Sequence, residues 1–596
     1  MSVILTSRFL SFLPESANSP GGKRSFQIIQ EGAGRLGLTT IRREPFFFSC
    51  ETNHSVNRPG DLGQLVLDVF PGTAASRRCF KCDPLQQGWS SWHEIAARQA
   101  QFYNLIQLNS DGFRLESDPM GLKPFYLARL PGGLVLASRI RDLVRLFPDL
   151  VRPVDPAGLY GLLVLKSPPS DRTLHEKIRR SASGACYHWK SETGLQITRE
   201  RRLNIPEVDP AVSMETALER IKNVMTTSLR QRVSELDRPV ILALSGGFDS
   251  RLLAGLSRDL GIPMKAVTYG RAHHREVQIA RRVAQTLKLD HQILPYPEDN
   301  LLNRLSLHLE VLEGQADLGV LQMANLLNLS GPLGTPLVHG FLGGVLAGQR
   351  VDRVREETCG SSDRLVEGIL LGYAEGLSFD ERSLLGLEFL QDAYRDALRA
   401  DLPNGCHPYQ ALVVWDLENR QRRFVSSALG LAAHWFDVIA PSYRPEVIQA
   451  WLSLPRIALE HRTLFRSLLA RYFPEMAKIP HTSEVHPVTP NLKHQIPLFV
   501  RWSLTKMTKR ILGREWYLRL LHPDIDLVWS SLTHAQKIHM HFRIKTLRPE
   551  MEMMLGLKPA EDMERALDGN PQFTRNLFLV AEYAARLADS KRLEVP

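Results

Sequence analysis

Cysteine is scarce in this chain, with six among 596 residues. So few thiols cannot build the disulfide framework of small secreted domains, and we therefore expect a protein of the reducing cytoplasm. Long apolar runs are also missing, because no stretch approaches the roughly 18 consecutive apolar residues of a transmembrane helix. The first residues lack a cationic segment followed by a sustained apolar one. We expect neither export nor a membrane span.

A metal framework and a nucleic-acid partner are also poorly supported. Cys79 and Cys82 form a C-x-x-C pair without a second pair at zinc spacing, so two loop thiols explain them better than a metal.

The net charge is +10, which is mild for this length. The stretch from Arg501 to Arg548 is basic and rich in aromatic residues. A solvated basic helical face explains it, although an acidic partner surface could also bind there, and we expect no nucleic acid.

The chain is long enough for about three to five domains at roughly 100–200 residues each. Residues from about 60 to 200 contain short strands separated by turns, whereas a helix over 214–233 is followed by alternating strands and helices. The second pattern is typical of parallel βαβ units. Beyond about residue 360 the period is almost entirely helical. We predict domains at 1–207, 208–490 and 491–596, the last a helical basic extension.

One segment has the composition of a phosphate site. Residues 239–244 form an apolar run of strand length, and Ser245-Gly246-Gly247-Phe248-Asp249-Ser250 follows directly before a helical stretch. Glycines at such a turn let the backbone approach an anion, and the N–H groups of a helix N-terminus point at it. A carboxylate beside phosphates is reconciled by a magnesium ion between them, which assigns Asp249 to Mg²⁺. The segment is not a Walker loop.

This loop is similar to the PP-loop of the ATP pyrophosphatases, and its surroundings resemble the asparagine synthetase family, in particular the asparagine synthetase B type. The matching segments lie in the same order as in the family over about residues 100 to 482. They include Asp118 to Tyr126 and Leu136 to Leu143, Ala266 to Gly270, Glu276 to His291, Arg422 to Ser427, Val438 to Pro441, Trp451 to Pro455 and Phe473 to Glu475.

The resemblance implies a fold and a set of site residues. The fold is an α+β Ntn-hydrolase-like sandwich, then an α/β adenine-nucleotide α-hydrolase-like (ATP pyrophosphatase) domain, and a helical C-terminal region. ATP and Mg²⁺ are the implied cofactors, with Asp249 as the metal ligand and Asp249 and Lys478 as catalytic residues. The implied ATP-binding residues are Leu244, Ser245, Gly246, Gly247, Asp249, Ser250, Thr268, Tyr269 and Gly340.

The chain departs from the family in two places. Residue 2 is Ser where the family's glutaminase half has a nucleophilic cysteine, so we expect a retained but inactive N-terminal domain, with a serine nucleophile as the alternative. In the segment from Val338 to Gly348, Gly344 stands where the family has a second magnesium-binding aspartate and Phe341 where it has a polar residue. Asp249 would then hold the metal alone or with another acid such as Asp317 or Asp352.

The resemblance therefore implies an ATP-dependent amide-forming enzyme without its own glutaminase activity, in which a small-molecule or peptide carboxylate is activated by adenylation. One alternative is a lasso-peptide macrolactam synthetase, with a precursor peptide or its leader as partner of the basic segment after residue 500. A second alternative, of a different class, is a non-catalytic nucleotide-binding scaffold, which the loss at Gly344 favours and the intact loop opposes.

Overall fold

The computed structural model describes residues 3–6, 9–14, 20–36, 38–42, 47–50, 64–69, 96, 100–108, 112–190, 192–199, 203–233, 236, 239–295, 300–329, 331–351, 366, 392, 395–399, 402–403, 405–481, 532, 534–555 and 571–592. Ser2, Cys79, Cys82 and Asp352, and most of the basic stretch from Arg501, lie outside the described residues.

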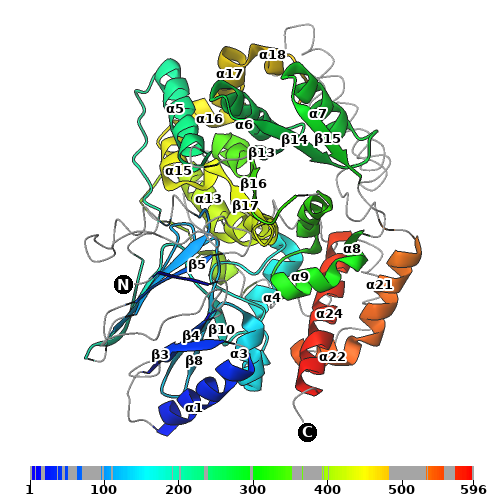
Figure 1. Cartoon of the computed structure of the whole chain (residues 1–596). Helices are drawn as coiled ribbons and strands as arrows, with labels where there is room; N and C mark the ends of the chain where they lie inside the picture. The colour runs from blue at the N-terminus through cyan, green and yellow to red at the C-terminus, as the bar shows by residue number, and fades with distance from the viewer. Residues whose placement is uncertain are drawn as a thin grey trace.

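Two six-stranded sheets form the N-terminal part of the chain (Figure 1). The first has the order β1 (Val3–Thr6), β5 (Gln64–Val69), β6 (Tyr103–Leu108), β7 (Gly112–Ser117), β11 (Cys186–Lys190) and β12 (Gly194–Thr198). The second has the order β10 (Ile178–Arg180), β8 (Tyr126–Leu130), β9 (Gly133–Ala137), β2 (Phe9–Pro14), β4 (Phe47–Cys50) and β3 (Thr39–Arg42). Only the β1–β5 pair is parallel among these described strands.

The two-residue period of a strand explains how these sheets pack. In β9, Leu134 and Leu136 join a core shared with β6, β7 and β11 of the first sheet, whereas Val135 and Ala137 join a core with the helices on the other face. These helices are α1 (Pro20–Arg35), α3 (Ile140–Leu146) and α4 (Pro156–Leu165). The result is a sandwich of two sheets with helices on one outer face.

A five-stranded, all-parallel sheet follows, in the order β15 (Asp290–Leu294), β14 (Met264–Tyr269), β13 (Val240–Ala243), β16 (Thr335–Val338) and β17 (Phe436–Ile439). The chain adds β14 and β15 on one side of β13 and then returns to add β16 and β17 on the other. The strand order therefore reverses beside β13, and in open α/β sheets ligands bind at such a point, beyond the carboxyl ends of the strands.

Further described helices lie along the whole chain, and only some of them pack on this sheet. Those before residue 350 are η2 (Pro148–Val151), α5 (Met214–Val233), α6 (Phe248–Asp259), α7 (Arg275–Thr286), α8 (Asn300–Asn303), α9 (Leu305–Val311), η3 (Leu318–Asn328) and η4 (Val345–Gln349). Those after it are α13 (Pro408–Asp416), η8 (Leu417–Val425), α14 (Ser426–Ala432), η9 (Pro441–Tyr443), α15 (Pro445–Leu452), α16 (Arg456–Leu459), η10 (Glu460–Arg462), α17 (Thr463–Tyr472), α18 (Pro474–Ala477), α21 (His534–Thr546), α22 (Arg548–Leu555) and α24 (Pro571–Arg592).

The C-terminal helices are part of the body of the protein. Helix α24 contacts α4, η3, α21 and α22, and its residues from Leu577 to Ala581 are fully buried in the core that also contains α4 (Figure 1). The side chain of Tyr583 hydrogen-bonds the buried ring of His175, with 2.9 Å between Oη and Nε2. Helix α24 is therefore hydrogen-bonded to a residue more than 400 positions earlier in the chain.

The sequence pattern predicted most of this architecture. The mixed α/β fold with a helical C-terminal region is confirmed, as are a helix over 214–233 and about five mostly parallel strands after it. The expectation of an almost entirely helical chain beyond about 360 is wrong at β17, since four buried residues are too few to show a period. Within the described part of the chain, no helix is both long enough and apolar enough to cross a membrane. The domain boundaries at 207/208 and 490/491 remain predictions.

Candidate functional site

The loop from Ser245 to Ser250 connects the carboxyl end of β13 to the N-terminus of α6. Leu244 is buried and extends the pairing with β14, its N–H donating to the Val267 carbonyl at 2.9 Å. Gly247 precedes the first helical residue, and a Cβ on it would lie 3.3 Å from Ser245 Oγ, so a glycine fits this turn best. The loop thus lies where the topology places a ligand site, as the sequence predicts.

The two serine hydroxyls hold the shape of this loop. Ser250 Oγ accepts from the Ser245 N–H at 3.0 Å and donates to the Ser245 carbonyl at 3.1 Å, and the two hydroxyls lie 3.0 Å apart. The Gly247 N–H donates to Ser245 Oγ at 3.2 Å. Both hydroxyls are therefore engaged within the loop here, and their predicted role as phosphate donors remains a prediction.

The carboxylate of Asp249 lies in the first turn of α6, facing the loop that follows β16. Two glycines of that loop are tightly packed: a Cβ on Gly340 would lie 3.0 Å from Asp249 Cβ, and one on Gly343 would lie 2.9 Å from Asp249 Oδ1. The Gly344 N–H hydrogen-bonds the carboxylate. Burial raises the pKa of Asp249 to about 6, against the lowering effects of this hydrogen bond and of Arg462.

Gly344 differs from its two neighbours because its position has room for a side chain. It has φ −63° and ψ −33°, a conformation open to any residue, and a Cβ there would lie in ordinary contact, 3.5 Å from Asp249 Oδ2. A carboxylate at position 344 would therefore stand beside that of Asp249. The loop that the sequence aligns with the family's second acid thus lies against the first one.

An arginine cluster, formed by Arg251, Arg462 and Arg466, surrounds the ring of Phe248 next to Asp249. Their guanidinium carbons lie 6.0, 5.9 and 5.3 Å from the ring centroid. The ring of His481 packs on the same phenylalanine with 4.2 Å between centroids. Burial, followed by the nearby arginines, lowers the pKa of His481 to about 3, so this ring is neutral at pH 7. The positive potential around the loop suits a polyphosphate.

Arg251 joins the loop to the segment after α18. Its fully buried guanidinium donates to the carbonyls of Gly246 at 2.9 Å and Ile479 at 2.7 Å, and also to that of Pro480. One side chain thus fixes both the Ser245 loop and the residues around Lys478. The side chain of Lys478 itself is exposed at the end of α18, and its catalytic role remains a prediction.

The other predicted ATP-binding residues come from β14. The buried hydroxyl of Thr268 donates to the Leu244 carbonyl at 2.7 Å and lies 2.9 Å from His291 Nε2, so it ties β14 to both neighbouring strands. Tyr269 ends the strand and lines a cavity of about 260 Å³. Both residues lie at the same sheet edge as the Ser245 loop.

The structure gives Asp317 a different role from the metal ligand considered above. Its carboxylate is fully buried and accepts two hydrogen bonds from Arg575 Nη2, at 3.0 and 2.9 Å. Burial alone would raise the pKa of Asp317, but Arg575 and Lys166 together lower it. Among the described residues, no group of three or more His, Cys, Asp or Glu side chains could hold a metal ion. A magnesium ion would therefore depend on Asp249, phosphates and water.

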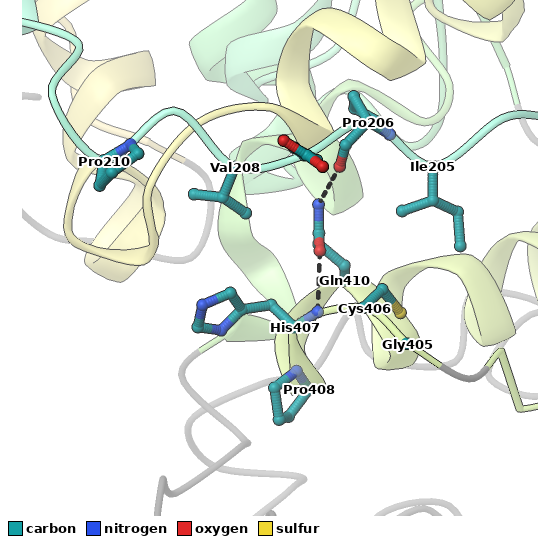
Figure 2. A pocket seen from close by; sticks show the side chains of 10 residues that line it. Ile205, Pro206, Val208, Pro210, Gly405, Cys406, His407, Pro408 and Gln410 are labelled. Carbon is teal, nitrogen blue, oxygen red and sulfur yellow. Dashed lines mark hydrogen bonds between the residues drawn. The ribbon is translucent and has the colours of Figure 1, made fainter.

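A second cavity, of about 580 Å³, lies away from these residues (Figure 2). The segment from Ile205 to Pro210 forms one side and Gly405 to Gln410 the other. Gln410 bridges the two, since its Nε2 donates to the Pro206 carbonyl and its Oε1 accepts from the His407 N–H, each at 2.9 Å. No residue of the predicted site lines it.

Sequence analysis missed the arginine cluster and His481. Arg462 reaches the site because it adopts φ 56° at the start of α17, a conformation that few non-glycine residues take. The residues next to Arg462 in the sequence do not predict this backbone conformation. Arg251 could have been found, because it follows the motif directly.

Together, the parallel sheet and the glycine-rich loop at its switch point define an α/β architecture with a candidate site at one edge of the sheet. Residues 220–327 match the family model "asparagine synthase", and this confirms the similarity to the asparagine synthetase family. The chain is thus similar to this family over that segment.

Two solved structures are similar to the chain at low identity. One is glutamine phosphoribosylpyrophosphate amidotransferase from B. subtilis complexed with ADP and GMP, with 11% identity over 48% of this chain and 80% of that one, and a TM-score of 0.21. The other is an allosteric regulatory enzyme of purine biosynthesis, with 10% identity over 49% and 76%, and a TM-score of 0.19. Such TM-scores say nothing about activity. The comparison with curated proteins gave no match.

Proposed function

We propose that the protein is an ATP-dependent carbon–nitrogen ligase that activates a carboxylate as an acyl-adenylate. The observation that carries this proposal is the position of Asp249, beside a glycine-rich loop at the switch point of a parallel sheet and in a cluster of arginines. The two-sheet N-terminal part is proposed to be Ntn-hydrolase-like, and the parallel sheet to be an ATP pyrophosphatase fold.

The proposed reaction has two steps. A carboxylate oxygen of the substrate forms a bond to the α-phosphorus of ATP, and the bond from that phosphorus to the bridging oxygen breaks, releasing pyrophosphate. An amine then attacks the acyl carbon, AMP leaves with the electron pair of the C–O bond, and the amine loses a proton to solvent. Both steps build negative charge on phosphate oxygens, which fixed donors and cations stabilise.

The residues of the chain have distinct proposed roles. The backbone of the Ser245 loop cradles the β- and γ-phosphates, and Arg462 and Arg466 compensate their charge. Asp249 fits Mg²⁺ because a single carboxylate plus phosphates and water satisfies this ion, which would neutralise charge on the departing pyrophosphate. The raised pKa of Asp249 fits such a role as well, since a cation would offset the cost of ionising the buried acid.

The source of the amine distinguishes the narrower functions within this proposal. We propose that the chain does not hydrolyse glutamine and therefore takes ammonia or a substrate amine. A macrolactam synthetase, in which the amine is a peptide N-terminus, stays a prediction. The non-catalytic scaffold is favoured by one observation, the missing second acid at Gly344, where a side chain would fit.

One experiment separates enzyme from scaffold. The purified chain is incubated with ATP, Mg²⁺, ammonium and a panel of carboxylic acids, and AMP and pyrophosphate are measured. We expect an acid-dependent, stoichiometric release of both, lost in Asp249→Asn, which keeps the shape of the side chain but not its charge. Lys222→Met on α5 is the control and should retain full activity. ATP binding without Mg²⁺, equal in wild type and Asp249→Asn, together with no AMP, would establish the scaffold instead.

A further inference from the structure

The cavity of about 260 Å³ lies at the same sheet edge as the Ser245 loop. It is lined by the aromatic residues Tyr269, Phe341 and Phe424, by aliphatic side chains including Met323, and by the cationic residues Lys166 and Arg575. None of the described residues that line it is acidic. The buried carboxylate of Asp317 offsets one of the two cations, so the cavity combines an apolar wall with one net positive charge, the composition of a site for a small anion with an apolar body.

Its position relative to Asp249 follows from the loop after β16. Phe341 lies in the same turn as Gly340 and Gly343, which pack directly against Asp249. The Phe341 N–H donates to His339 Nδ1 at 3.2 Å, and the two rings pack at an angle of 43° with 3.9 Å between centroids. One short loop therefore contacts the proposed metal ligand and forms part of the cavity wall.

The cationic end of the cavity is built from three distant parts of the chain. Lys166 ends α4 with φ 77°, a left-handed conformation in which glycine is the least strained residue. Its carbonyl accepts from the Asp317 N–H at 2.8 Å, and its ammonium lies 5.3 Å from the centroid of Phe424. The buried Asp317 in turn fixes Arg575 of α24. The lysine is therefore held in a strained but defined place, over an aromatic ring.

We propose that this cavity binds the acid substrate of the ligase, and that the acid is monocarboxylic with an aromatic or branched aliphatic body. The inference rests on the function proposed above. The carboxylate pairs with Lys166 and the body packs among the aromatic rings. A cavity of about 150 Å³ is filled by benzene, so 260 Å³ suits one ring with a short chain. Aspartate fits poorly, because its second charge would lie on the apolar wall.

Binding of 3-phenylpropanoate, measured by titration calorimetry without ATP, tests this inference. Its neutral amide, 3-phenylpropanamide, and L-aspartate are the comparison ligands. We expect the acid to bind about tenfold or more tightly than either comparison ligand. The pairing of its carboxylate with Lys166 should add the binding free energy of a charge-assisted hydrogen bond. Lys166→Met should lower the affinity for the acid to that for the amide and leave the amide unchanged. Ala428→Phe, which fills the cavity from α14, should abolish both.

The control is Lys222→Met, because Lys222 also lies over an aromatic ring, 4.3 Å from the centroid of Tyr472, but on a helix that does not line the cavity. Equal affinity for acid and amide, tighter binding of aspartate, or unchanged binding in Ala428→Phe would each overturn the inference. Since no ATP is present, binding as expected with no AMP from any acid would refute the proposed function alone. AMP formed with aspartate and no binding of 3-phenylpropanoate would refute this inference alone.

Discussion

Restoring an acid at position 344 gives the sharpest test of the metal assignment. In Gly344→Asp the backbone needs no change, because φ is −63°, and the new Cβ lies 3.5 Å from Asp249 Oδ2. Two carboxylates about 4 Å apart repel each other by about 1 kcal/mol in water and about 4 kcal/mol at an effective dielectric constant near 20. The substituted protein should therefore lose roughly 1 to 4 kcal/mol of stability at pH 8 without a divalent cation.

Magnesium should reverse this loss, because a cation between the two acids replaces their repulsion by attraction. The first measurement is urea unfolding at pH 8 with and without 10 mM Mg²⁺ and ATP. The second, on the folded protein, is the rate of pyrophosphate release as a function of the Mg²⁺ concentration. We expect Gly344→Asp to gain more stability from Mg²⁺ than the wild type does, and to reach half its maximal rate at a lower Mg²⁺ concentration.

Two matched variants identify the cause. Gly344→Asn has nearly the same shape without the charge, and should show neither the loss nor the extra gain. Gly343→Ala should be destabilised whether or not Mg²⁺ is present, because its Cβ would lie 2.9 Å from Asp249 Oδ1. The reasoning is refuted if Mg²⁺ stabilises the wild type, Gly344→Asn and Gly344→Asp equally.

Three further predictions concern Asp249, Arg575 and Ser2. Because burial raises the pKa of Asp249 from 3.8 to about 6, its contribution to the stability of the metal-free protein is complete below about pH 4 and is lost as pH rises through 6; urea midpoints that match those of Asp249→Asn at every pH would contradict this. Arg575→Met should cost about 3–5 kcal/mol by leaving the buried Asp317 without its guanidinium, and adding Asp317→Asn should recover part of it in the same unfolding assay. No glutamate should form from glutamine, because a serine hydroxyl is a weak nucleophile, and release abolished by Ser2→Ala would disprove it.

Local patterns predicted the elements that carry the proposed phosphate site. An apolar run, a glycine-rich turn and an amphipathic helix follow one another within a few residues, so the strand β13, the loop and α6 could be predicted from neighbouring residues alone. The same holds for α5 and for the hairpin of β6 and β7. The position of Asp249 at a sheet edge then follows from the general geometry of parallel sheets.

Contacts between distant segments could not be predicted. The pairing of Asp317 with Arg575 joins residues 258 positions apart, and neither lies in a pattern that differs from an ordinary surface charge. The same is true of Arg462, whose place depends on a left-handed backbone conformation. Such geometry is decided by packing between elements, which a single sequence does not encode in any short window.

The contact between α24 and η3 also bears on how the protein is made. A ribosome adds roughly 5–20 residues per second. Arg575 is therefore synthesised on the order of ten seconds to a minute after Asp317, with which it pairs. During that interval α24 is absent, so Asp317 has no guanidinium partner and the 260 Å³ cavity lacks the part of its wall that Arg575 forms. The nascent chain can complete its parallel sheet before α24 is made, but its proposed substrate pocket is assembled only when α24 folds back onto η3. The proposed acid binding is therefore acquired only after α24 has been synthesised.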